Sequence, residues 1–184
     1  MKHKHIVLGF VLTGMIATSQ VAFADDDGDE HEGFFSRFST SSAAIPHNKL
    51  YQESCASCHM GFQPNLLPSA SWEKIMSPKA LEDHFGDNAE VNEKDRQAIL
   101  VYLKTYAADQ KGRRLLRFGR GEAPMRITEL RYFKREHNEI PKRMVQGNPK
   151  VRSLSNCMAC HTGAERGDYS ERGIRIPSYG RWED

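Results

Sequence analysis

The pentapeptides Cys55-Ala56-Ser57-Cys58-His59 and Cys157-Met158-Ala159-Cys160-His161 are two copies of one pattern, C-x-x-C-H. Together they contain all four cysteines of the 184-residue chain. In this pattern the two thiols form thioethers with one edge of a haem, and the adjacent imidazole reaches the iron as its proximal ligand. Two disulfides or a zinc site would leave both histidines without a role. The sequence therefore predicts two covalently attached haem c groups, on Cys55, Cys58 and His59 and on Cys157, Cys160 and His161.

The first 24 residues have the pattern of a secretory signal peptide. Lys2 and Lys4 precede an apolar run, and Ala22-Phe23-Ala24 provides the small residues of a cleavage site. Glycine and hydroxyl residues interrupt the apolar run, which makes it a poor membrane anchor. We therefore expect residues 1–24 to be a cleaved signal peptide and the mature protein to be periplasmic.

The charges of the predicted mature chain are divided between its two halves. Residues 25–109 contain 15 acidic and 7 basic residues, a net charge of −8, and residues 110–184 contain 9 acidic and 17 basic residues, a net charge of +8. Such a dipole can orient a charged partner during encounter, although charged runs are often no more than solvated surface. No nucleic-acid recognition motif accompanies the basic half, so we expect no nucleic-acid partner.

Composition divides the mature chain into four segments. Residues 25–44 are acidic and then rich in serine and threonine, which is typical of a flexible lead-in. Residues 45–110 form a first haem-binding unit, and the basic, glycine-containing residues 111–120 form a linker. Residues 121–184 form a second, loop-rich haem-binding unit, because glycine and proline recur after its haem motif. The fold class expected from these segments is mainly α.

Helix-capping residues mark the helices expected in both units. Ser71 and Asn92 are candidate N-caps, and Asn92 begins the longest helix, in which apolar residues recur at helical spacing. Another short helix is expected to start after Ser77-Pro78 and to run through Leu81 to Phe85. In the second unit we expect one clear helix over residues 128–137. A helix, a haem motif, a loop and a closing amphipathic helix follow one another in the first unit, as in small monohaem cytochromes c.

The ligand on the far side of each iron decides what the haem can do. A second histidine gives a low-potential electron carrier, methionine raises the potential, and an open position can bind gas or peroxide. His84 follows His59 by 25 residues, which is enough chain to pass around the haem edge. His137 precedes Cys157 by 20 residues, at the end of an amphipathic helix. We expect His84 at the first iron and His137 at the second.

Four other residues remain alternatives at these two positions. Met76 competes with His84, and Met125 or Met144 competes with His137, although each methionine is also suited to core packing. His47 precedes Cys55 by eight residues, so reaching the far face of its own haem is awkward. Methionine at one iron is therefore the second choice.

Five stretches carry a resemblance to a known family: Leu50–Met60, Leu66–Trp72, His84–Gly86, Arg135–His137 and Val151–Gly163. They include both haem motifs, and the chain that contains them resembles the dihaem cytochrome c (DHC) family.

The resemblance implies a class I cytochrome c-like N-terminal domain and two haems with two histidine ligands each. His84 and His137 match the family's distal positions. The resemblance also implies electron donation to a small high-spin, oxygen-binding monohaem cytochrome, with electrons supplied by a membrane b-type cytochrome. Contact with a membrane would then occur only through such a partner.

The function expected from these observations is electron transfer rather than enzymatic catalysis. Two irons with both axial positions filled offer no site for a substrate. Two alternatives remain: the small dihaem subunit of a periplasmic reductase, and a gas-binding or peroxidase-like protein with one open haem.

Overall fold

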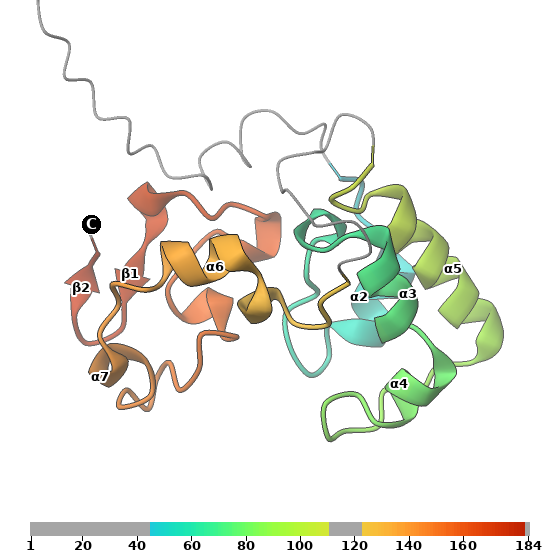
Figure 1. Cartoon of the computed structure of the whole chain (residues 1–184), viewed down its shortest axis with the longest axis horizontal. Helices are drawn as coiled ribbons and strands as arrows, with labels where there is room; N and C mark the ends of the chain where they lie inside the picture. Colours follow the sequence, from blue (N-terminus) through green and yellow to red (C-terminus); the bar gives the residue numbers. More distant parts are fainter. Residues whose placement is uncertain (1–44, 111–122, 183–184) are drawn as a thin grey trace, which may run out of the picture.

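The structure, a computed structural model, describes residues 45–110 and 123–182. The predicted signal peptide (1–24), the acidic lead-in (25–44) and the predicted linker (111–120) lie outside these described residues. Figure 1 shows residues 45–110 as one helical group and residues 123–182 as a second group beside it.

Residues 45–110 form four helices joined by short loops. These helices are α2 (Lys49–Cys55), α3 (Ser69–Ile75), α4 (Pro78–Glu82) and α5 (Glu93–Thr105), with a 3₁₀ turn at Pro64–Leu66. The longest of them, α5, packs against α2 and α3. Helix α2 ends on Cys55, the first residue of the first haem motif.

Asn92 caps α5 as predicted. Its side-chain oxygen accepts the backbone N–H of Asp95 at 3.0 Å, and this bond satisfies one of the free donors at the start of the helix. Ile99 and Leu103 are almost fully buried, whereas Val101 on the opposite side of the helix is 64% exposed. The apolar face of α5 therefore supplies much of the core of the first group.

The two shorter helices α3 and α4 are capped in different ways. Helix α4 begins at Pro78, close to the expected start, and the hydroxyl of Ser77 caps it by accepting the N–H of Ala80. The prediction for Ser71 was wrong, because α3 begins at Ser69 and Ser71 lies buried within it. The carboxylate of Asp109 accepts hydrogen bonds from the Ser69 N–H and hydroxyl, at 2.9 and 2.8 Å, and so caps this helix from a residue distant in the sequence.

Residues 123–182 contain short elements and long loops. The helices are α6 (Arg131–Glu136) and α7 (Lys142–Val145), and the strands β1 (Arg175–Ile176) and β2 (Gly180–Arg181) form an antiparallel pair. Four 3₁₀ turns occupy Ile127–Glu129, Cys157–Ala159, Ala164–Arg166 and Glu171–Gly173. The helix expected over residues 128–137 is interrupted at Leu130, whose extended backbone turns the chain between a 3₁₀ turn and α6.

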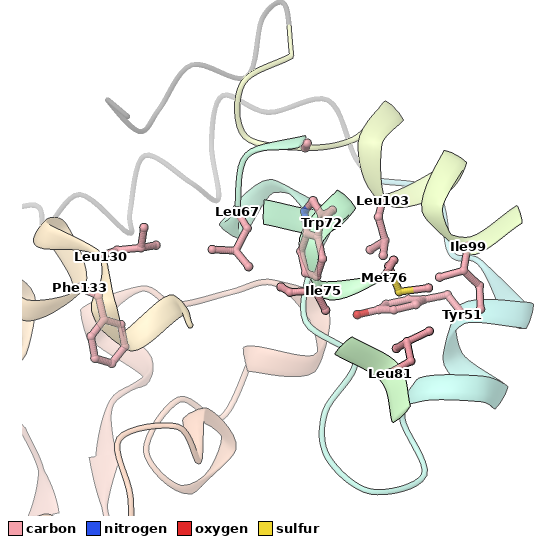
Figure 2. Packing of buried hydrophobic residues seen from close by; sticks show 11 residues of the cluster. Tyr51, Leu67, Trp72, Ile75, Met76, Leu81, Ile99, Leu103, Leu130 and Phe133 are labelled. Carbon is pink, nitrogen blue, oxygen red and sulfur yellow. The ribbon is translucent and has the colours of Figure 1, made fainter. Parts of the chain in front are cut away.

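One hydrophobic cluster is shared by the two groups. Tyr51, Trp72 and Leu103 belong to it together with Leu130 and Phe133 from the second group. Figure 2 shows Leu130 and Phe133 on the side of the cluster nearest Leu67. The two groups therefore bury apolar surface against each other.

These elements confirm the mainly α fold class. The second group is loop-rich, as expected, with two two-residue strands. The finer likeness of the first group to class I cytochromes c stays a prediction. Within residues 45–110 and 123–182, no helix combines the length and the apolarity that a membrane span requires.

Candidate haem sites

The second candidate site brings together the two histidines predicted for it. The ring centroids of His137 and His161 lie 6.2 Å apart, with the ring planes inclined at 65°. His137 follows α6, and its Nδ1 is 2.8 Å from the carbonyl oxygen of Phe133. The ring of His137 also stacks on the ring of Phe133, with the two ring centroids 4.0 Å apart. Both contacts hold the imidazole of His137 toward His161.

The first candidate site has the same spacing. The ring centroids of His59 and His84 lie 6.2 Å apart, with the ring planes inclined at 22°. The Nδ1 atom of His59 is 2.7 Å from the carbonyl oxygen of Met60. The ring centroids of His59 and Phe62 lie 5.2 Å apart. His59 is exposed and His84 is half-buried, so this site is more open to solvent than the second one.

The separation of 6.2 Å fits two imidazoles on opposite sides of one metal ion. A metal–imidazole bond is about 2 Å long and a ring nitrogen lies roughly 1.2 Å from the ring centre, so two opposed ligands place their centroids about 6.4 Å apart. In both pairs an Nδ1–H can donate to a backbone carbonyl on at least one ring, which leaves Nε2 for the metal. The donor sets therefore fit haem iron.

A hairpin with unusual backbone geometry presents His84. The N–H of His84 donates to the carbonyl oxygen of Asp87 at 2.7 Å, and the two residues between them, Phe85 and Gly86, have φ values of 59° and 109°. Positive φ is uncommon for a residue with a bulky side chain. The chain therefore turns back at Phe85 immediately after the histidine, whereas the helix expected to continue to Phe85 ends at Glu82.

A cation from the second group lies beside this hairpin. The guanidinium carbon of Arg126 lies 4.0 Å from the centroid of the Phe85 ring, and the Phe85 ring in turn contacts His84. Burial lowers the pKa of His84, and the charges of His59 and Arg126 lower it further. Both effects favour the neutral imidazole, which is the form that binds a metal. Sequence reasoning missed Arg126, because no motif marks it.

Burial also favours the neutral form of His161. It lowers the pKa of this imidazole to about 4, and the nearby His137 adds to the shift. His161 is 8% exposed. An imidazole of this kind is neutral at physiological pH and available to a metal.

None of the four cysteines forms a disulfide in the structure, so all four are available for thioether bonds to haem. Burial raises the pKa of Cys157 to about 11 and also raises the pKa values of Cys55 and Cys160.

A cavity of about 920 Å³, counted with its open mouth, lies beside Cys157, Cys160, His137 and His161. Its remaining walls are mainly apolar, including Leu66, Phe133, Val145, Val151, Leu154, Ile174 and Ile176. Such a lining suits the flat apolar surface of a porphyrin, so the residues present fit a haem. Leu66 belongs to the first group, which therefore contributes to the second site.

The alternative ligands have other surroundings. Met76 is 4% exposed and packs in the cluster that contains Ile99, and Met125 packs against the same cluster. Met144 lies on α7 and is not among the described residues that line the cavity. His47 is exposed. These placements favour histidine at both irons, while the ligand set stays a prediction.

Comparison with known proteins agrees with two haem sites. The family model for dihaem cytochrome c (DHC) matches residues 51–169. A dihaem c-type cytochrome from Shewanella baltica OS155 is 43% identical, and its structure matches with a TM-score of 0.64 over 76% of this chain and 100% of that chain. The dihaem cytochrome c from Rhodobacter sphaeroides is 42% identical, with a TM-score of 0.61 over 69% of this chain and 100% of that chain. A comparison with curated proteins found no match.

The family match covers more than half of the chain and includes both C-x-x-C-H motifs. The two solved structures are aligned over their whole length at more than 40% identity. The cofactors are two covalently attached haem c groups, as the sequence predicts. The chain belongs to the dihaem cytochrome c family.

Proposed function

We propose that this chain is an exported electron carrier in which each haem iron has two histidine ligands. The ligands are His59 and His84 at the first iron, and His161 and His137 at the second. The observation that carries the proposal is the separation of 6.2 Å between the ring centroids in both pairs. Family membership itself implies electron transfer.

The protein's own groups orient the ligands. The carbonyl oxygens of Met60 and Phe133 accept from the Nδ1–H groups of His59 and His137, which would leave each Nε2 available to bind an iron. Bound haem supplies a one-electron couple between ferric and ferrous iron. The apolar walls around His161 limit access of water, and they thereby favour the less charged ferrous form.

Filled axial positions also argue against an enzyme. A substrate, gas or peroxide needs an open position on the iron, and the proposed ligand set leaves none. The same reasoning makes an open-haem gas-binding or peroxidase-like protein the weaker alternative. A dihaem subunit of a periplasmic reductase would have the same ligands and a permanent partner.

The proposed acceptor is a small high-spin, oxygen-binding monohaem cytochrome, and the proposed donor is a membrane b-type cytochrome. The charges of the described residues support encounter with charged partners. Residues 45–110 contain 9 acidic and 6 basic residues, net −3, whereas residues 123–182 contain 6 acidic and 12 basic residues, net +6. Opposite charge on a partner raises the association rate at low ionic strength.

Stopped-flow mixing tests this function. The reduced holoprotein is mixed with an oxidised high-spin monohaem cytochrome, and the oxidation of its haems is followed at increasing salt concentration. Rapid second-order oxidation that changes with salt is expected. Failure of the partner to oxidise the holoprotein would exclude this acceptor, and co-purification with a larger reductase would support the subunit alternative.

Export has an independent test. Mass spectrometry of the periplasmic holoprotein is expected to give a chain that begins at Asp25 and carries two haems. A chain that retains residues 1–24 would contradict cleavage.

A further inference from the structure

The side chain of Gln63 crosses the boundary between the two groups. Gln63 belongs to the loop that follows the first haem motif, yet all its side-chain hydrogen bonds in the structure are to the second group. Its amide nitrogen donates to the carbonyl oxygens of Ala164 and Glu165, at 2.8 and 3.2 Å. Its amide oxygen accepts from the hydroxyl of Tyr169, which is 106 residues away in the sequence.

Tyr169 connects this amide to the second haem site. The Tyr169 ring is 4% exposed and packs edge-on against the ring of His161, with the centroids 5.5 Å apart. Tyr169 also lines the cavity beside Cys157. Tyr169 therefore contacts the amide of Gln63 through its hydroxyl and the imidazole of His161 through its ring.

The loop that contains Gly167 allows the side chain of Gln63 to approach its backbone closely. Gly167 has a φ of 75°, and a Cβ atom added there would lie 3.3 Å from Cγ of Gln63. Met60 and Leu66 of the first group pack against Ala164 and Tyr169 in one small cluster. Apolar packing therefore lies beside the hydrogen bonds of Gln63 to Ala164 and Tyr169, which are partly buried, whereas the bond to Glu165 is exposed.

We propose that Gln63 is a positioning residue for the second haem site: its amide holds Tyr169 and residues 164–169 against His161. The first group thereby completes a site whose attachment residues lie wholly in the second group. The proposal rests on haem attachment at Cys157, Cys160 and His161, and it deepens the proposed function.

Loss of the hydrogen bonds made by the Gln63 amide has two expected consequences. The His161 ring loses a fixed neighbour, so its orientation at the iron changes. The loosened loop also admits water, which favours ferric iron and lowers the reduction potential of the second haem. A threefold to tenfold change in that one-electron equilibrium corresponds to a decrease of about 28–59 mV.

The test compares Gln63→Leu and Tyr169→Phe with the wild type, all as full-length holoproteins. Gln63→Leu removes all three hydrogen bonds, whereas Tyr169→Phe removes one and keeps the ring. Tyr102→Phe is the matched control, because the Tyr102 hydroxyl donates to Pro46 within the first group. Proton NMR of the oxidised protein resolves the haem methyl signals. Nuclear Overhauser contacts to Phe133 assign the second haem, and contacts to Phe62 assign the first.

The expected result is a change in the methyl shifts of the second haem in both variants, with the larger change in Gln63→Leu. One of the two reduction midpoints decreases in parallel, and Tyr102→Phe alters neither haem. Unchanged methyl shifts would overturn the proposal, as would equal changes at both haems. If Gln63→Leu fails to take up haem, Tyr169→Phe alone is compared with the wild type, and the same criteria apply.

A wrong ligand assignment would give a different NMR result from a wrong role for Gln63. High-spin methyl shifts in the wild-type protein would show an iron with an open position, so the proposed ligand set would fail before any variant is compared. A low-spin wild type with unaltered variants would overturn the role of Gln63 alone.

Discussion

The imidazole planes of His137 and His161 are inclined at 65°, although the centroids of these rings have the same 6.2 Å separation as those of His59 and His84. The planes of His59 and His84 are inclined at only 22°. Phe133 determines part of this difference, because its ring stacks on His137 with the planes 13° apart. The two haem sites therefore share one ligand spacing and differ in ligand orientation.

This difference predicts two distinct electron paramagnetic resonance signals from the oxidised holoprotein. Nearly parallel imidazoles split the iron d orbitals strongly and give a rhombic low-spin signal, which we expect from the first site. Steeply inclined imidazoles leave two d orbitals close in energy and give a more anisotropic signal, which we expect from the second site. Two identical signals would contradict the ring orientations.

Substitution of the proposed distal ligands is expected to open one iron at a time. Carbon monoxide should bind to one haem per chain in His84→Ala and in His137→Ala, and to both haems in the double variant, as measured by titration of the reduced protein. His47→Ala is the matched control, because His47 is exposed. A double variant that remains fully low-spin would exclude this ligand assignment.

The charge of Arg126 is expected to protect the first site against acid. Burial and the charges of His59 and Arg126 lower the pKa of His84, so protonation that releases this ligand requires a lower pH. Arg126→Gln removes a positive charge that opposes protonation. The conversion of the first haem from low-spin to high-spin should therefore occur at higher pH in this variant, as measured by absorption during an acid titration.

Arg126→Lys keeps the charge and is the control for this titration. Its midpoint should stay closer to that of the wild type than the midpoint of Arg126→Gln. A midpoint for Arg126→Gln at or below the wild-type value would contradict an electrostatic role for Arg126.

The packing of α5 predicts a contrast between two residues of one helix. Leu103 is 1% exposed, so Leu103→Ala should lower the free energy of unfolding by about 2–5 kcal/mol through lost burial and a residual cavity. Val101 is 64% exposed, so Val101→Ala should change the free energy of unfolding by roughly 0.5 kcal/mol or less. Denaturant unfolding followed by circular dichroism measures both. Equal losses would contradict the orientation of α5.

Local signals in the sequence predicted much of the first group. The C-x-x-C-H spacing predicted both haems, and Asn92 caps α5 as predicted. The prediction for Ser71 failed because α3 takes its cap from Asp109, at a sequence separation that no local pattern shows. The histidine pairs were predicted from separation along the chain, and the structure brings both pairs to one common distance.

Contacts between the two groups could not be predicted. No sequence motif marks the residues that contact the other group, which are Gln63, Tyr169 and Arg126. The Tyr169 hydroxyl bonds the Gln63 amide, and Arg126 packs on the Phe85 ring. Leu130 interrupts the expected helix at the point where its side chain enters the shared cluster, so tertiary packing overrides the local helical pattern there.

The absorption spectrum of the reduced holoprotein, with and without carbon monoxide, tests the central claim most directly. Both irons are expected to be closed by His84 and His137, so the low-spin spectrum should not change when carbon monoxide is added. A shift in the bands of either haem would show an open or labile iron, and it would contradict an electron carrier with two histidine ligands at each haem.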